Sequence, residues 1–180
     1  MRPPRPKHKL TATALTTLAA LLLAGCGVRP TGVLDGGEAA GGLTKGLRLY
    51  FVSQAGRLEG VARPGIPASQ VTDPKAVIKY LLVGPVESER DAGLTTLLGD
   101  DGSYDATVDG DRVTVHIPQG ALLGSPVENR NLKGQLVCSI ARARAMADSN
   151  GTTQTDDIRV TLRPRGDTRP GTYVCSDFLK

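Results

Sequence analysis

The stretch NLKGQLVCSIARARAMA, residues 131–147, places a helix between two groups of predicted strands and so decides the fold class. Apolar side chains recur in it at steps of three or four, which is the spacing of one helix face: Leu132, Leu136, Ile140, Ala143 and Ala147. Asn129 or Asn131 is a suitable N-cap, because a side-chain oxygen accepts a hydrogen bond from a free N–H group of the first turn. Cys138 lies on this helix.

A second, earlier helix is predicted from TDPKAVIKYLLVGP, residues 72–85. Asp73 is a suitable N-cap and Pro74 fits the first helical position, while Gly84 and Pro85 end the helix. The apolar side chains between them follow helical spacing: Ala76, Val77, Tyr80, Leu81 and Leu82.

Strands are predicted before, between and after these helices. LRLYFVS, residues 47–53, alternates apolar and polar positions, and RLEGVAR, residues 57–63, is its hairpin partner. A second hairpin covers residues 104–117, with Asp109-Gly110-Asp111 as its turn, and IRVTLRP, residues 158–164, is a further strand. The resulting β-β-α-β-β-α-β order predicts an α+β single domain, residues 47–180, with an antiparallel or mixed sheet and two helices packed on one face.

The N-terminal segment, residues 1–25, has the pattern of an export signal. Four basic residues precede an apolar run, Leu10–Ala24, whose length as a helix, roughly 22 Å, is short of the ~30 Å hydrocarbon core. Leu23-Ala24-Gly25-Cys26 resembles a bacterial lipobox, which predicts lipidation of Cys26; an ordinary secretory signal is the alternative. Two acyl chains on Cys26 would anchor the protein to the lipid bilayer.

Residues 26–46 form a glycine-rich stretch without apolar periodicity, which predicts a flexible tether after Cys26. Removal of residues 1–25 also changes the charge of the protein. That segment holds four of the 22 lysine and arginine residues and none of the 18 acidic residues, so the remaining chain has a formal net charge of zero. A basic surface for nucleic acid is therefore not expected.

The chain has three cysteines. With Cys26 lipidated, Cys138 and Cys175 remain, and a disulfide between them is the default for a small exported domain in an oxidising compartment. Two separate buried thiols are the alternative. The bridge would attach the C-terminal tail to the second helix.

Residues that carry catalysis or bind metal are sparse in the mature sequence. His116 is its single histidine, and strand alternation places it on the face opposite Val115 and Ile117. An acidic run holds Asp100, Asp101, Asp105, Asp109 and Asp111. An EF-hand starting at Asp101 would need glycine and glutamate where the chain has Ala106 and Arg112, so only a looser calcium loop remains as an alternative to turn chemistry. Arg142 and Arg144 are expected on a solvated helix face, pointing in different directions. No metal or cofactor is expected.

Several segments together resemble the GerMN domain of sporulation and spore germination proteins and of actinobacterial lipoproteins. These are, in order, LRLYFVSQAGRLEGVAR, AVIKYLLVGPVESERDAGLTTLLG, ATVDGDRVTVHI and GQLVCSIARA, and the resemblance covers roughly Leu47 to Leu162. Leu97-Leu98-Gly99 replaces a proline-bearing turn of the family. The resemblance implies a noncatalytic extracytoplasmic module of envelope complexes, in sporulation or germination or beside sensor kinases.

The resulting prediction is a noncatalytic binding or scaffolding lipoprotein on the outer face of the cytoplasmic membrane. Its expected partners are the bilayer, through acylated Cys26, and an envelope protein or peptidoglycan that the sequence does not identify. A cell-wall hydrolase that uses two of the scattered carboxylates is the alternative.

Overall fold

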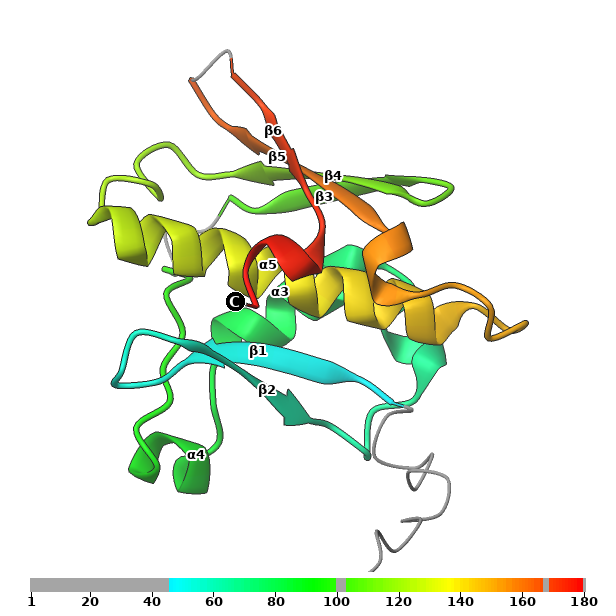
Figure 1. The fold of residues 1–180 in the computed structure, drawn as a ribbon, viewed down its shortest axis with the longest axis horizontal. Helices are drawn as coiled ribbons and strands as arrows, with labels where there is room; N and C mark the ends of the chain where they lie inside the picture. The colour runs from blue at the N-terminus through cyan, green and yellow to red at the C-terminus, as the bar shows by residue number, and fades with distance from the viewer. Residues whose placement is uncertain (1–45, 100–102, 167–168, 180) are drawn as a thin grey trace, which may run out of the picture. The chain divides into compact units, whose positions relative to one another are not determined.

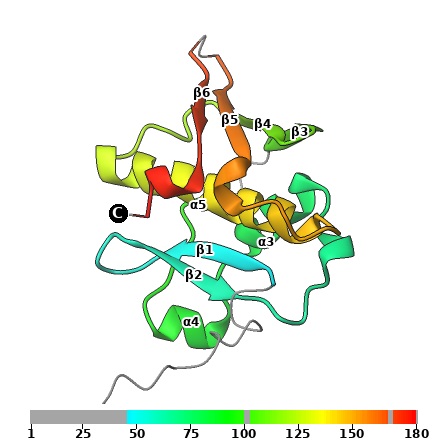
Figure 2. The same cartoon turned by 45° about the vertical axis from the view of Figure 1, so that its right-hand side comes forward.

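Helix α5, Pro126–Ala147, runs through the middle of the domain with a β-sheet on each side of it (Figure 1). The structure is a computed structural model that describes residues 46–99, 103–166 and 169–179. All of these residues belong to one compact unit, Ala40–Lys180. The turned view shows the same arrangement of α5 between the two sheets (Figure 2).

The smaller sheet is an antiparallel hairpin, and the larger sheet has the order β3-β4-β5-β6. β4 and β5 are parallel because α5 crosses over between them, whereas the other neighbours are antiparallel. The strands are β1 Arg48–Val52, β2 Leu58–Ala62, β3 Asp105–Asp109, β4 Arg112–Ile117, β5 Arg159–Pro164 and β6 Gly171–Tyr173.

The helix α3, Pro74–Val83, packs against α5 and β1. Its predicted ends are confirmed: the Asp73 side chain accepts a hydrogen bond from the Lys75 N–H, Pro74 begins the helix, and Gly84 ends it with a positive φ of 82°. The remaining helical segments are short: η1 Ala68–Gln70, α4 Glu87–Asp91, η2 Thr155–Asp157 and η3 Cys175–Asp177.

The structure is an α+β domain, as the sequence predicts, and its order β-β-α-β-β-α-β is extended by α4 and β6. The prediction of one sheet with both helices on one face is wrong, because the strands form two sheets. The reason is the burial of α5: every residue from Gly134 to Ala141 is buried, which covers all faces of the helix over two turns. A helix buried on all sides needs partners on more than one side.

Helix α5 begins one to two turns earlier than the sequence predicts. Ser125 is the N-cap: its Oγ accepts from the Glu128 N–H and the Glu128 carboxylate accepts from the Ser125 N–H, a capping box. The predicted caps, Asn129 and Asn131, both lie inside the helix. Asn131 is instead buried and donates to the Gly56 carbonyl at 2.8 Å.

Asn131 is the first of a row of polar side chains on α5 that bond to the backbone of the smaller sheet. Gln135 Nε2 donates to the Tyr50 carbonyl at 3.0 Å, and the Tyr50 N–H donates to Ser139 Oγ at 2.9 Å. Gln135 Oε1 also accepts from the Leu97 N–H at 2.7 Å. Gln135 and Ser139 are fully buried, so these bonds satisfy their side chains as well as backbone groups of the partly buried Tyr50 and Leu97.

We predict that Gln135→Leu lowers the free energy of unfolding by about 2–4 kcal/mol, because it removes the partners of the Tyr50 carbonyl and the Leu97 N–H in a partly buried setting. Leucine keeps most of the side-chain volume, so a cavity does not account for the loss. Urea denaturation measures the change. Gln154→Leu, at an exposed position, is the control and should stay within about 0.5 kcal/mol; equal losses in both variants would contradict the assigned role of Gln135.

Candidate functional site

The predicted lipidation residue, Cys26, lies outside the described residues, as does the predicted signal, residues 1–25, and the predicted tether up to residue 45. The described part of the tether is Gly46, where the domain begins. Within the described ranges, no helix combines the length and the apolar character needed to cross a membrane.

The two remaining cysteines, Cys138 and Cys175, are joined by a disulfide with an S–S distance of 2.07 Å. The bond attaches η3 to the middle of α5, and both cysteines are buried. Their sequence separation is 37, and closing a loop of that length restricts the unfolded chain enough to contribute about 4 kcal/mol. Arg130 strengthens the attachment, because its guanidinium donates to the carbonyls of Asp177 and Phe178.

The attached tail forms one wall of a hollow, which we call the tail groove. The hollow has a volume of about 370 Å³, within the range of small-molecule sites. It lies between the outward face of β1, the side of α5 and the two 3-10 helices η2 and η3, whose arrangement is visible in Figure 2. In addition to Cys175, the residues that give the tail groove its chemical character are Arg48, Tyr50, Arg142, Asp156, Ser176 and Leu179.

Strand alternation and the 3-10 helices bring these residues together. Arg48 and Tyr50 alternate with the buried Leu49, so their side chains emerge on the opposite face of β1. The Asp156 carboxylate accepts from the Ser176 N–H at 2.9 Å and so joins η2 to η3. The tail groove is therefore assembled from segments that are far apart in the sequence.

Arg142 is one of the residues that line the tail groove. Its Nε donates to the Gly46 carbonyl at 3.1 Å, and within the described ranges its two terminal nitrogens have no protein acceptor. A second hollow of about 500 Å³ shares Arg142 and Thr155 with the tail groove and extends past Met146. Arg142 thus lines both hollows.

The prediction of a solvated face for Arg142 and Arg144 is wrong, because both side chains are half-buried and bond to backbone carbonyls. Arg144 donates to the carbonyls of Thr72 and Gly110 at 3.3 and 3.4 Å. Their divergent directions are as expected for residues two positions apart on a helix. The role of Arg142 was not visible in the sequence, since neither Gly46 nor the tail segment is near it along the chain.

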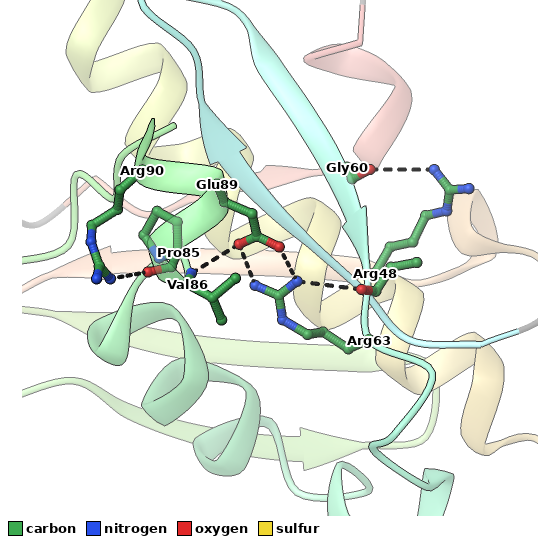
Figure 3. Close-up of polar contacts among 8 residues, drawn as sticks. Arg48, Gly60, Arg63, Pro85, Val86, Glu89 and Arg90 are labelled. Atoms are coloured by element: carbon green, nitrogen blue, oxygen red, sulfur yellow. Dashed lines mark hydrogen bonds and ion pairs between the residues drawn. The ribbon is translucent and has the colours of Figure 1, made fainter. Parts of the chain in front are cut away.

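A second charged cluster joins the β1–β2 hairpin to the segment around α4 (Figure 3). Arg63 forms a bidentate ion pair with Glu89, with N–O distances of 2.6 and 2.7 Å, and Glu89 also accepts from the Val86 N–H. The hydrogen bonds from Arg63 hold the pKa of Glu89 below its usual value, and the Val86 N–H adds to this effect. The pair joins the end of β2 to α4 and has a structural role.

The same cluster protects the outer edge of β2. Arg48 donates to the Gly60 carbonyl at 3.4 Å and Arg63 donates to the Ala62 carbonyl at 3.3 Å (Figure 3). Because the Arg63 N–H donates to the carbonyl of Leu47, directly before β1, the alternation of an antiparallel ladder turns the backbone groups of Gly60 and Ala62 away from β1. The two arginines therefore cover acceptors that an added strand would use.

The predicted acidic run is divided by the structure. Asp100 and Asp101 lie outside the described residues, whereas Asp105, Asp109 and the turn residue Asp111 lie on the β3–β4 hairpin. Asp105 pairs with Lys75 at 2.8 Å, a surface contact. In the described part of the chain, no group of three or more His, Cys, Asp or Glu side chains is arranged to hold a metal ion.

His116 lies between the buried Val115 and Ile117 in β4 and is itself half-buried, so the predicted strand alternation is confirmed.

Asp148, directly after α5, holds the following loop in place through hydrogen bonds to its carboxylate. No sequence pattern indicates this role. The Asp148 carboxylate accepts from the backbone and hydroxyl groups of Thr153 and Thr152 and from the Asn150 N–H. These bonds lower the pKa of Asp148 strongly, and the bond from the Thr153 N–H contributes most. The loop leads into η2, so Asp148 helps to position one wall of the tail groove.

The fold and the tail groove together define a disulfide-bonded α+β domain with a concave, arginine-containing surface. Comparisons with protein families, with curated proteins and with solved structures found no match for this chain.

We predict that the Arg63–Glu89 pair makes stability depend on pH in the acid range. The pKa of Glu89 is lowered in the folded state, so its contribution is present above the unfolded value of about 4.3 and is lost as the pH falls through the folded value. Glu89→Gln should therefore be destabilised most at pH 7 and converge with the wild type in acid, as measured by urea denaturation from pH 7 to 3. Glu87→Gln, exposed on the same helix, is the control; a gap for Glu89→Gln that does not narrow in acid would contradict the assignment.

Proposed function

We propose that this chain is a noncatalytic, lipid-anchored binding module of the cell envelope, related to GerMN-domain lipoproteins. The observation that carries the proposal is the disulfide between Cys138 and Cys175, which holds the tail against α5 and thereby builds a wall of the tail groove. A structural disulfide persists in an oxidising compartment. A concave surface that depends on it is suited to work outside the cytoplasm.

The location of the protein is supported by the order of features before the domain. A basic segment, an apolar run and the Leu23–Cys26 sequence occur in the order of a lipoprotein signal. Acylated Cys26 would hold the protein at the outer face of the cytoplasmic membrane. The following tether, residues 26–46, would have a root-mean-square span of roughly 25 Å if it is flexible.

A binding role is supported by the position of the tail groove next to the start of the domain. The Gly46 carbonyl accepts from Arg142, which lines the groove, so the tether joins the domain beside this surface. Segments far apart in the sequence supply the lining, and one wall is covalently fixed. Such a preformed surface binds at lower entropic cost than a flexible one.

We predict that Cys26→Ser prevents lipidation, because serine lacks the thiol that accepts the diacylglyceryl group. The variant should leave the membrane pellet and appear in the culture medium or remain as unprocessed precursor, and it should lose the label after growth with radioactive palmitate. Cys138→Ser, which leaves Cys26 in place, is the control and should stay labelled. A labelled, membrane-retained Cys26→Ser protein would contradict the anchoring proposal.

We predict that the purified wild-type protein enriches a specific envelope protein or peptidoglycan fragment from envelope extracts. The Cys138→Ala/Cys175→Ala protein should enrich it less, because the tail wall is then unattached. Mass spectrometry of the bound fraction measures the enrichment. Failure to enrich anything would contradict the binding role, and release of soluble fragments from peptidoglycan would favour the hydrolase alternative.

A further inference from the structure

We infer that the tail groove binds a carboxylate, such as the free C-terminus of a peptide, through the guanidinium group of Arg142. The inference deepens the proposed binding function and rests on it, but it is independent of the lipid anchor. It names the chemistry of the ligand, which neither the sequence pattern nor the overall fold specifies.

The first argument is the hydrogen bonding of the Arg142 guanidinium group. A guanidinium offers five N–H donors in a rigid plane. One of them, on Nε, is used by the Gly46 carbonyl, and this bond fixes the orientation of the side chain. Within the described ranges the terminal nitrogens contact no protein acceptor, so the structure presents an oriented fork with four N–H groups beside a hollow.

The second argument is the match between that fork and a carboxylate. Arginine and carboxylate groups pair through two parallel hydrogen bonds, which adds geometric selectivity to the charge attraction. Arg142 is half-buried, so a ligand bound there would be partly shielded from water and the attraction would be stronger than on an open surface.

The third argument is the lining of the tail groove. Asp156 places a negative charge in the same lining as the guanidinium groups of Arg48 and Arg142. That carboxylate repels a phosphate, which carries nearly two charges at neutral pH, more than it repels a singly charged carboxylate. The Tyr50 ring and the half-exposed Leu179 side chain supply apolar surface for the rest of the ligand.

The fourth argument is the second hollow, which shares Arg142 and Thr155 with the tail groove. A ligand whose carboxylate pairs with Arg142 has room for its chain on either side of that residue. The combination of a carboxylate site with an extended concave surface fits the end of a peptide better than it fits a small inorganic anion.

The test uses the purified full-length lipoprotein in detergent and three probes: acetyl-Ala-Ala with a free carboxylate, the same dipeptide with a C-terminal amide, and inorganic phosphate. Hydrogen bonds to a charged group contribute enough to change affinity by roughly tenfold to a hundredfold. The free acid should therefore bind at least about tenfold more tightly than the amide in calorimetric titrations, and phosphate should not compete with it at equal concentration.

Variants assign the effect to Arg142. Arg142→Gln should weaken binding of the free acid about tenfold or more while leaving binding of the amide unchanged. Arg144→Gln removes the same charge from the same helix but lies outside the tail groove, so it is the matched control and should bind like the wild type. If Arg142→Gln does not fold, Arg142→Lys keeps the charge without the planar fork and should still bind the acid more weakly.

Any one of four results would overturn the inference. These are equal affinity for the acid and the amide, absence of binding by either, full competition by phosphate, and an Arg142→Gln protein that binds like the wild type. Failure of the proposed function gives a different result. Enrichment of an envelope partner without selectivity for the free acid would refute the carboxylate site alone, whereas loss of both would refute the binding module as well.

Discussion

The structure depends on hydrogen-bond partners for the backbone groups on one edge of β1, the edge that faces away from β2. Among the residues that the structure describes, β1 has one strand neighbour, β2, so alternate backbone groups on its other edge need partners. The Tyr50 N–H and carbonyl, which point away from β2, bond to Ser139 and Gln135 of α5. Next along the edge, Val52 and Thr95 exchange two backbone hydrogen bonds. The helix and a loop together thus replace a missing strand.

This substitution explains the burial of α5. One side of the helix bonds to the smaller sheet, and the other carries the apolar residues that pack beneath the larger sheet. Gly134 allows the close approach, because a Cβ there would meet the Leu58 side chain and would lie 3.1 Å from the Phe178 Cβ. With α5 fixed on both sides, Cys138 is held where the tail reaches it, and Arg142 is held beside Gly46.

Local signals in the sequence predicted the elements well and their partners poorly. Alternation located the strands, and Asp73, Pro74 and Gly84 located the ends of α3 because capping depends on neighbouring residues. The start of α5 was missed because two asparagines looked like caps, whereas Ser125 and Glu128 form the capping box. The sequence indicates neither the bond of Asn131, which it offers only as a cap, nor those of Gln135, since their partners are backbone groups more than 35 residues away in the sequence.

The sequence by itself determined the α+β class and the order of the main elements, because periodicity and caps are local properties. It favoured a bond between Cys138 and Cys175 from the cysteine count, and the structure shows that bond. Only the tertiary structure decided that the strands divide into two sheets around α5, and that Arg48, Arg142, Asp156 and Ser176 line one groove. These features depend on which buried polar groups find partners and on how distant segments pack. Neither the partners of buried polar groups nor the packing of distant segments follows a regular spacing along the chain, so no sequence pattern reveals them.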